Sequence, residues 1–171
     1  MFFKRSSPQA ADAAWWRDAE AAATNPSAET IARLRREMSA ATSPDERERR
    51  EEFVEGLDRV LELSTNGGLP SIVTQHRVIG TDLCHFVAPV SLAGQVESSG
   101  KLFLTSHRIV FAGHGVQSWP WHRVRTVVRL GRDLAIIVAG AADAVQIQCN
   151  CYGDALTALH MATDLAGRKR S

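Results

Sequence analysis

Apolar residues in the first part of the chain recur every three to four positions, which is the spacing of one face of an α-helix. Residues 10–24 are rich in alanine and are followed by the helix-breaking pair Asn25-Pro26, which predicts a first helix that ends there. The side chain of Ser27 is suited to cap a second helix. The apolar positions of that second helix are Ile31, Leu34 and Met38.

A third helix has the clearest start signal in the chain. Ser43 is a capping residue, Pro44 takes the first helical position, and Glu46 lies where a capping box needs a glutamate. Residues 45–52 are almost all charged, so we expect the first turns to be solvated. The apolar stripe that follows consists of Phe53, Val54, Leu57, Val60 and Leu61. This stripe is expected to pack on the rest of the chain or on a second copy of it.

The hydrophobic period changes from about 3.6 to 2 after residues 64–70, whose sequence STNGGLP is rich in turn formers. We therefore divide the chain into a helical segment, residues 1–66, and a second part, residues 67–171. Alternating apolar residues predict short strands in the second part. Their expected ranges are 84–92, 101–105, 108–111, 116–119, 124–130, 134–138 and 144–149. An amphipathic pattern over residues 153–166 predicts one closing helix.

Residues 100–111, GKLFLTSHRIVF, form the most specific pattern in the chain. They predict a hairpin in which alternate apolar residues share one face and Thr105–His107 make the reversal. The run resembles the pattern Gly-x-Leu-aromatic-Leu-Thr-x-x-Arg-Leu-Val-Phe of GRAM and bacterial pleckstrin-homology-like domains, where it marks the second and third strands. Weaker similarities to that family follow in the expected order at residues 118–124 and 131–134.

The resemblance covers roughly residues 70–167 and implies an architecture. The expected fold class is α+β, with about three N-terminal helices before a pleckstrin-homology-like antiparallel β-barrel or sandwich closed by a C-terminal helix. No single function comes with the resemblance, because that fold hosts lipid, protein and peptide binding alike.

Composition narrows the class of protein. At 171 residues, with 44% hydrophobic and 23% charged residues, the chain is expected to be globular. Its net charge of +1 conceals an acidic first part and a mildly basic second part, and that basic excess is too small for a nucleic-acid-binding protein. Three cysteines argue against a disulfide framework, and no apolar run approaches the roughly 20 residues that span a bilayer. We expect a cytoplasmic protein.

Residues 123–132, which include the expected strand 124–130, contain four arginines within ten positions. This stretch follows two tryptophans, Trp119 and Trp121. Strict alternation would put Arg123, Arg125 and Arg129 on one face of that strand. Guanidinium groups near tryptophan suit an anionic lipid headgroup or an acidic protein surface. The alternative is a solvated outer face paired with acidic residues of the N-terminal helices. The adjacent Val127 and Val128 leave room for a bulge that would break the alternation.

Metal and enzyme chemistry have weak sequence support. Cys84, Cys149 and Cys151 lie in or beside expected strands, which favours small core residues over zinc ligands. His85, His107 and His122 are expected on the surface or in turns. No nucleophile elbow, P-loop, GxGxxG or HExxH pattern occurs in the sequence. We expect no cofactor and no metal.

The sequence therefore predicts a non-catalytic binding or adaptor module. A protein partner or self-association is favoured over peripheral binding to anionic lipid, and a small enzyme is the third alternative. Trp15 and Trp16 are expected to anchor the helical core, with a partner contact as the alternative. The candidate binding residues are Trp119, Trp121, Arg123, Arg125, Arg129, Arg132 and Arg108.

Overall fold

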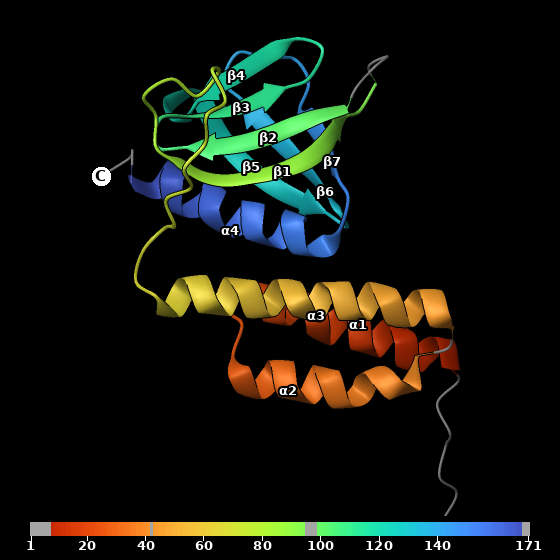
Figure 1. Cartoon of the computed structure of the whole chain (residues 1–171). Helices are drawn as coiled ribbons and strands as arrows, with labels where there is room; N and C mark the ends of the chain where they lie inside the picture. The colour runs from red at the N-terminus through yellow and green to blue at the C-terminus, as the bar shows by residue number, and fades with distance from the viewer. Residues whose placement is uncertain (1–7, 42, 95–98, 169–171) are drawn as a thin grey trace, which may run out of the picture.

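The computed structural model describes residues 8–41, 43–94 and 99–168. Figure 1 shows the N-terminal helices on one side of a strongly twisted sheet, with the C-terminal helix between them and the sheet. The helices are α1 (Pro8–Thr24), α2 (Ala28–Glu37), α3 (Pro44–Thr65) and α4 (Tyr152–Arg168), with short 3-10 turns η1 (Met38–Ala40) and η2 (Trp121–Arg123). The strands are β1 (Cys84–Leu92), β2 (Ser99–Thr105), β3 (Arg108–Ala112), β4 (Val116–Pro120), β5 (Val124–Leu130), β6 (Asp133–Val138) and β7 (Val145–Cys149). The predicted helices and strands are all confirmed.

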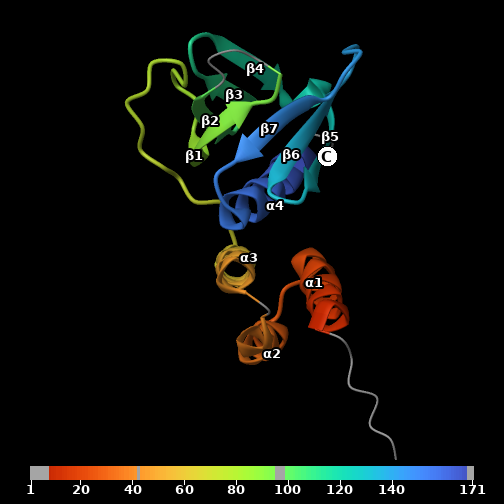
Figure 2. The same cartoon turned by 90° about the vertical axis from the view of Figure 1, so that its right-hand side faces the viewer.

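The seven strands form one antiparallel sheet in the order β4-β3-β2-β1-β7-β6-β5. Strands β1–β4 form one meander and β5–β7 form a second. The two meanders are joined where β1 pairs with β7, and β4 and β5 do not pair. Within the described residues β4 and β5 are the two edges, and the sheet curls without closing into a barrel. Helix α4 covers its concave side with Ala155, Ala158, Ala162 and Leu165 (Figure 2). The α+β class and the antiparallel strands followed by a closing helix are as predicted.

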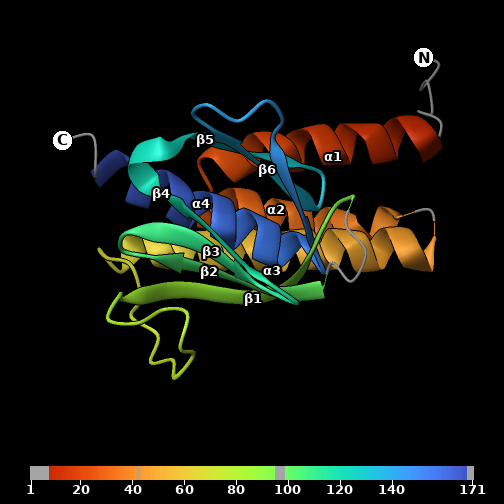
Figure 3. The same cartoon turned by 90° about the horizontal axis from the view of Figure 1, so that it is seen from above.

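The segment between α3 and β1 covers part of the other side of the sheet (Figure 3). Ile79 packs there against Phe103 and Val110, and the backbone N–H of Ile72 donates to the carbonyl of Cys84 over 2.8 Å. A register shift between Cys84 and Phe86 places Cys84 in this outer cluster. Strict alternation along β1 would put Cys84 on the same face as Phe86, and the register shift moves it to the opposite face, where it is still buried.

His85 is also placed differently from the prediction. Only 8% of the residue is exposed, and its Nδ1 lies 2.7 Å from the carbonyl oxygen of Pro70. The covering segment buries the imidazole, and a period-two pattern carries no information about such a cover.

The charged start of α3 is more buried than predicted. The hydroxyl of Ser43 accepts a hydrogen bond from the backbone N–H of Glu46 over 3.1 Å, as a helix cap should. The Glu46 carboxylate, however, accepts from Trp16 Nε1 at 2.5 Å and from Arg50 Nε at 3.1 Å. Arg50 is 1% exposed because α1 packs over this turn and supplies Asp12 as a second carboxylate partner. The expected solvation of residues 45–52 is wrong at these two positions.

Aromatic side chains fill the core between the helices. Trp15 and Trp16 meet edge to face with ring centroids 5.0 Å apart, and Trp16 lies 5.4 Å from the rings of both Phe53 and Tyr152. The indole N–H of Trp15 donates to the carbonyl of Leu34 over 3.2 Å. The prediction that both tryptophans anchor the helical core is confirmed.

The helical segment docks on α4 through a close helix crossing. A Cβ atom added to Gly56 would lie 2.7 Å from Leu156 Cδ1 and 2.9 Å from the Cα of Gly153. Leu156 of α4 is a member of the helical core, together with Leu57 and Val60 of the predicted stripe. The stripe therefore packs on this chain, and the two parts share one interface. No helix among the described residues is long and apolar enough to cross a membrane.

Candidate functional site

The hairpin turn between β2 and β3 ties two parts of the fold together. Thr105 is fully buried, and its hydroxyl accepts the backbone N–H groups of Arg108 at 3.1 Å and His107 at 3.3 Å. The guanidinium of Arg108 donates to Asp82 at 3.0 Å and to the carbonyl of Val78 at 3.2 Å. The Thr-x-x-Arg pattern thus fastens the covering segment to the sheet. Arg108 thus has a structural role, and the contact of its partly exposed side chain with a partner stays a prediction.

Replacing Thr105 with valine should lower the free energy of unfolding by about 1–3 kcal/mol, because two buried N–H groups lose their acceptor while the side-chain volume stays the same. Thr126→Val makes the same chemical change at an exposed position of β5 and should stay within about 0.5 kcal/mol of the wild type. Urea unfolding followed by circular dichroism measures both. Equal effects would show that the hydroxyl network contributes nothing to stability.

A bulge in β5 decides where the predicted basic strand points. Val124 pairs with Val138, and the register then shifts so that Thr126 pairs with Ile137. After the shift, Val128 and Leu130 lie on the outer face, where they are 38% and 56% exposed. Strict alternation would put Val128 and Leu130 on the same face as Val124, and a bulge of the kind anticipated for this strand breaks that alternation.

The four arginines of this region do not share one uncovered face. The side chain of Arg129 is 8% exposed, makes an ion pair with Glu20 of α1, and lies 5.3 Å above the ring of Phe53. Arg132 lies 3.8 Å from a carboxylate oxygen of Glu52 in α3. The alternative in which arginines of this strand pair with acids of the N-terminal helices is confirmed for these two residues.

The other predicted site residues are distributed between surface and core. Arg123 and Arg125 are exposed, and Arg123 donates to the carbonyl of Ala139 at 3.2 Å. Trp119 is half-buried on edge strand β4. Trp121 is 3% exposed, and its indole N–H donates to the carbonyl of Thr105 over 2.8 Å. Trp121 is thus corrected from a candidate contact to a core residue, because the η2 turn rotates its side chain inward.

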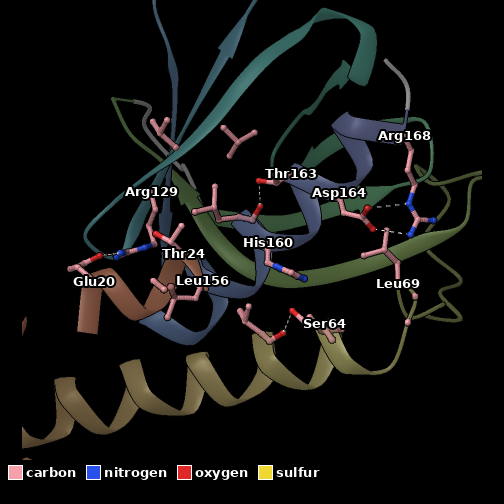
Figure 4. Close-up of a pocket in the computed structure, with 18 residues that line it drawn as sticks. Glu20, Thr24, Ser64, Leu69, Arg129, Leu156, His160, Thr163, Asp164 and Arg168 are labelled. Carbon is pink, nitrogen blue, oxygen red and sulfur yellow. Dashed lines mark hydrogen bonds and ion pairs between the residues drawn. The ribbon is translucent and has the colours of Figure 1, made fainter. Parts of the chain in front are cut away.

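A groove of about 780 Å³ lies where the helical segment meets α4 and β5 (Figure 4). Its apolar walls come from four separate stretches of the chain, which is why no local sequence pattern indicated it. The apolar residues that line it are Ala23, Val60, Leu63, Leu69, Val127, Val128, Leu156 and Leu159. The volume is typical of binding sites for small molecules or short peptide segments, and the groove is lined by apolar and by polar side chains.

Polar side chains are set along the rim of this groove. Figure 4 shows the pair Glu20 and Arg129 at one end and the pair Asp164 and Arg168, 2.8 Å apart, at the other. His160 projects from α4 between them. Each carboxylate is matched by a guanidinium, so the rim presents paired charges around an apolar floor.

The groove runs along the free edge of β5. Val127, Val128 and Arg129 are consecutive, so their side chains point alternately to the two faces of the sheet, yet all three line the groove. Consecutive residues of a strand border one groove where the strand presents its edge. Since β5 is the last strand of the sheet, that edge faces the groove with no further strand beside it.

No family model and no curated protein matches the sequence. Solved structures with a similar arrangement include the Vps36 N-terminal PH domain, at 12% identity and a TM-score of 0.43 over 61% of this chain and 89% of that one. They also include the DH/PH domain of human ARHGEF11 in a complex with human RhoA and its inhibitor, at 10% identity and a TM-score of 0.44 over 94% of this chain. The chain spans about 55% of the length of that DH/PH chain. The strand order described above, rather than these similarities, defines the fold.

The described residues do not bring together side chains placed to bind a metal ion or to relay a proton from a hydroxyl to a histidine and an acid. They contain no group of three or more histidine, cysteine or acidic side chains placed to hold a metal ion. His107 Nδ1 lies 3.1 Å from Asp82, but Ser106 Oγ approaches the same nitrogen at 3.0 Å, so the ring does not bridge acid and hydroxyl. Asp82 also accepts from Arg108. His107 therefore belongs to the hairpin tie.

The three thiols are free and shielded. Burial raises the pKa of Cys149 to about 12, with the negative charges of Asp154 and Asp133 adding to the effect. Burial also raises the pKa of Cys84 and of the half-buried Cys151. Raised values leave little thiolate at neutral pH, and the thiolate is the reactive species.

Alkylation by iodoacetamide at pH 8 should therefore be slow in the native protein and at least about tenfold faster in urea. Cys151 should react first and Cys149 last, as followed by intact-mass and peptide mass spectrometry. Native Cys149 reacting as fast as Cys151 would contradict the buried placement of its thiol.

Proposed function

We propose that this chain is a non-catalytic binding module that holds a peptide segment of a partner protein in the groove between the helical segment and β5. The single observation that carries the proposal is the combination, in one groove, of an apolar floor and the free edge of a strand. An exposed edge is a template for backbone pairing. Buried apolar walls supply affinity, and paired charges at the rim restrict which segment fits.

The proposal also covers the domain family of the second part of the chain and the compartment in which the protein acts. Residues 67–171 are proposed as a GRAM-like or bacterial pleckstrin-homology-like domain, and residues 1–66 as a helical segment that completes its binding surface. Both parts contribute to the groove, since Val60 comes from α3 and Leu159 from α4. Three free, shielded cysteines support the cytoplasm as the working compartment.

Capture from a cell lysate with matched variants tests this function. Thr163→Trp places an indole in the groove from an exposed position of α4, and Val116→Trp adds the same group at the opposite edge of the sheet. Proteins that bind through the groove should be captured by the wild type and by Val116→Trp, and lost with Thr163→Trp. A set of captured proteins that Thr163→Trp leaves unchanged would overturn the proposal.

Binding to anionic membranes is disfavoured by the arginine geometry. A headgroup site needs uncovered basic side chains, whereas Arg129 and Arg132 face carboxylates of the helices. We expect less than about a tenth of the protein to co-sediment with phosphatidylserine vesicles at 0.1 M salt, where screening acts over about 10 Å. Strong co-sedimentation that Arg123→Glu/Arg125→Glu abolishes would instead establish the membrane function.

A further inference from the structure

The free edge of β5 suggests how the segment is held, beyond the existence of a groove. Residues 127–129 line the groove through consecutive positions, and β5 pairs on its other side with β6. Among the described residues, no backbone hydrogen bond outside the β5–β6 ladder is formed by Thr126, Val127 or Val128. A peptide segment lying in the groove along this edge would therefore lie next to the backbone N–H and carbonyl groups of β5.

Both faces beside this edge are apolar. On the groove side, an added strand would find Val127, Leu156 and Leu159. On the outer side it would lie next to Val128, Leu130 and Ile137, which are 38%, 56% and 41% exposed. Alternate side chains of a strand point to opposite faces, so both alternating sets of the incoming segment would be placed on apolar surface.

The charged residues near β5 indicate which type of residue should flank the apolar part of the bound segment. Arg123, at the end of the η2 turn, and Arg125 of β5 are exposed, and β5 contains no acidic residue. A second copy of the chain pairing edge to edge would bring the exposed Arg125 side chains of two β5 strands together, and neither strand contains an acid. Like charges across a ladder are destabilising, whereas an acidic residue of another protein would be favoured there.

We infer that the occupant is an extended segment of another protein that adds as a strand to the free edge of β5, with consecutive apolar or β-branched residues and an acidic residue beside Arg123 and Arg125. Backbone pairing supplies the affinity common to all such segments. The two apolar faces and the arginines supply the selectivity. This inference rests on the proposed function, since it specifies the occupant of the same groove.

The first experiment uses random twelve-residue peptides displayed on phage, selected on the immobilised full chain and counter-selected on Thr163→Trp. The expected enriched sequences contain four or more consecutive apolar or β-branched residues with aspartate or glutamate at one end. Apolar residues spaced by three and four, the pattern of a helix, would overturn strand addition. Failure to enrich any sequence over the Thr163→Trp variant would overturn both the inference and the proposed function.

The second experiment asks whether the backbone of the selected peptide is used. Two versions of the tightest peptide carry N-methyl groups at its odd or its even positions. In an added strand only one alternating set of N–H groups faces β5, so one version should lose affinity by about tenfold or more while the other changes by less than about threefold. Fluorescence anisotropy measures both.

The possible failures are distinguishable. Equal effects of the two methylation patterns, with Thr163→Trp still blocking the unmodified peptide, would overturn strand addition and leave the groove as the binding site. A chain that is a dimer in light scattering, and becomes a monomer with Val128→Lys, would assign the edge to a second copy and overturn the inferred partner. A monomer with the asymmetric methylation result is the expected outcome.

Discussion

Replacing Gly56 with leucine is expected to lower the free energy of unfolding by about 3 kcal/mol, because the new side chain has no space at the α3–α4 crossing. A Cβ atom alone would lie 2.9 Å from the Cα of Gly153, and backbone cannot rotate away as a flexible side chain does. The steric clash can be relieved only if α3 and α4 move apart. That movement would expose Leu156, which is 3% exposed in the native fold.

Gly167→Leu is the matched control for this substitution. Gly167 also lies in a helix, α4, but a Cβ atom there has no neighbour within 4 Å. We expect no loss of stability and a small gain from helix propensity, up to about 1 kcal/mol. Guanidinium unfolding measures both variants. A Gly56→Leu protein as stable as Gly167→Leu would contradict the close docking of the helical segment on α4.

Replacing Arg50 with alanine should lower the free energy of unfolding by about 3–5 kcal/mol, because two carboxylates would be left without their buried partner. The guanidinium of Arg50 contacts both Glu46 and Asp12 and lies 4.7 Å above the ring of Trp15. Its removal therefore loses an ion network and a cation–π contact together, at the point where α1 is fastened to α3.

Two further variants separate charge from packing at this site. Arg50→Met keeps most of the volume and should recover part of the loss, whereas Arg47→Ala removes an exposed partner of Glu51 and should change stability by less than about 1 kcal/mol. Thermal unfolding in the same buffer compares them. If Arg50→Ala resembled Arg47→Ala, the buried network would not be part of the native state in solution.

Secondary structure was predictable because its signals are local. The period of the apolar residues separates helices from strands on either side of residues 64–70, and Ser27 and Ser43 cap the helices that they were expected to cap. The hairpin pattern of residues 100–111 predicted β2, β3 and the reversal between them. Its threonine and arginine proved to be a tie to Asp82, a role that appears only once the covering segment is in place.

The groove could not be predicted, because its walls meet only in three dimensions. Of its lining residues, Arg129 alone was a candidate, and for a different face of β5. Strict alternation along β5 would place the Arg129 side chain on the same outer face as Arg125. The bulge between Val124 and Thr126 places it on the opposite face. Similarly, the buried state of Arg50 depends on Asp12, thirty-eight positions away, and no pattern within α3 records that contact.

Hydrogen exchange of the full chain, with and without a partner captured through the groove, tests the central claim most directly. The claim is that the partner lies between the helical segment and the free edge of β5. We predict that binding slows exchange of backbone amides in residues 125–130 and 156–163, while residues 101–112 of the hairpin keep their exchange rates. Slowed exchange confined to β1–β4, with no change along β5 or α4, would contradict the claim.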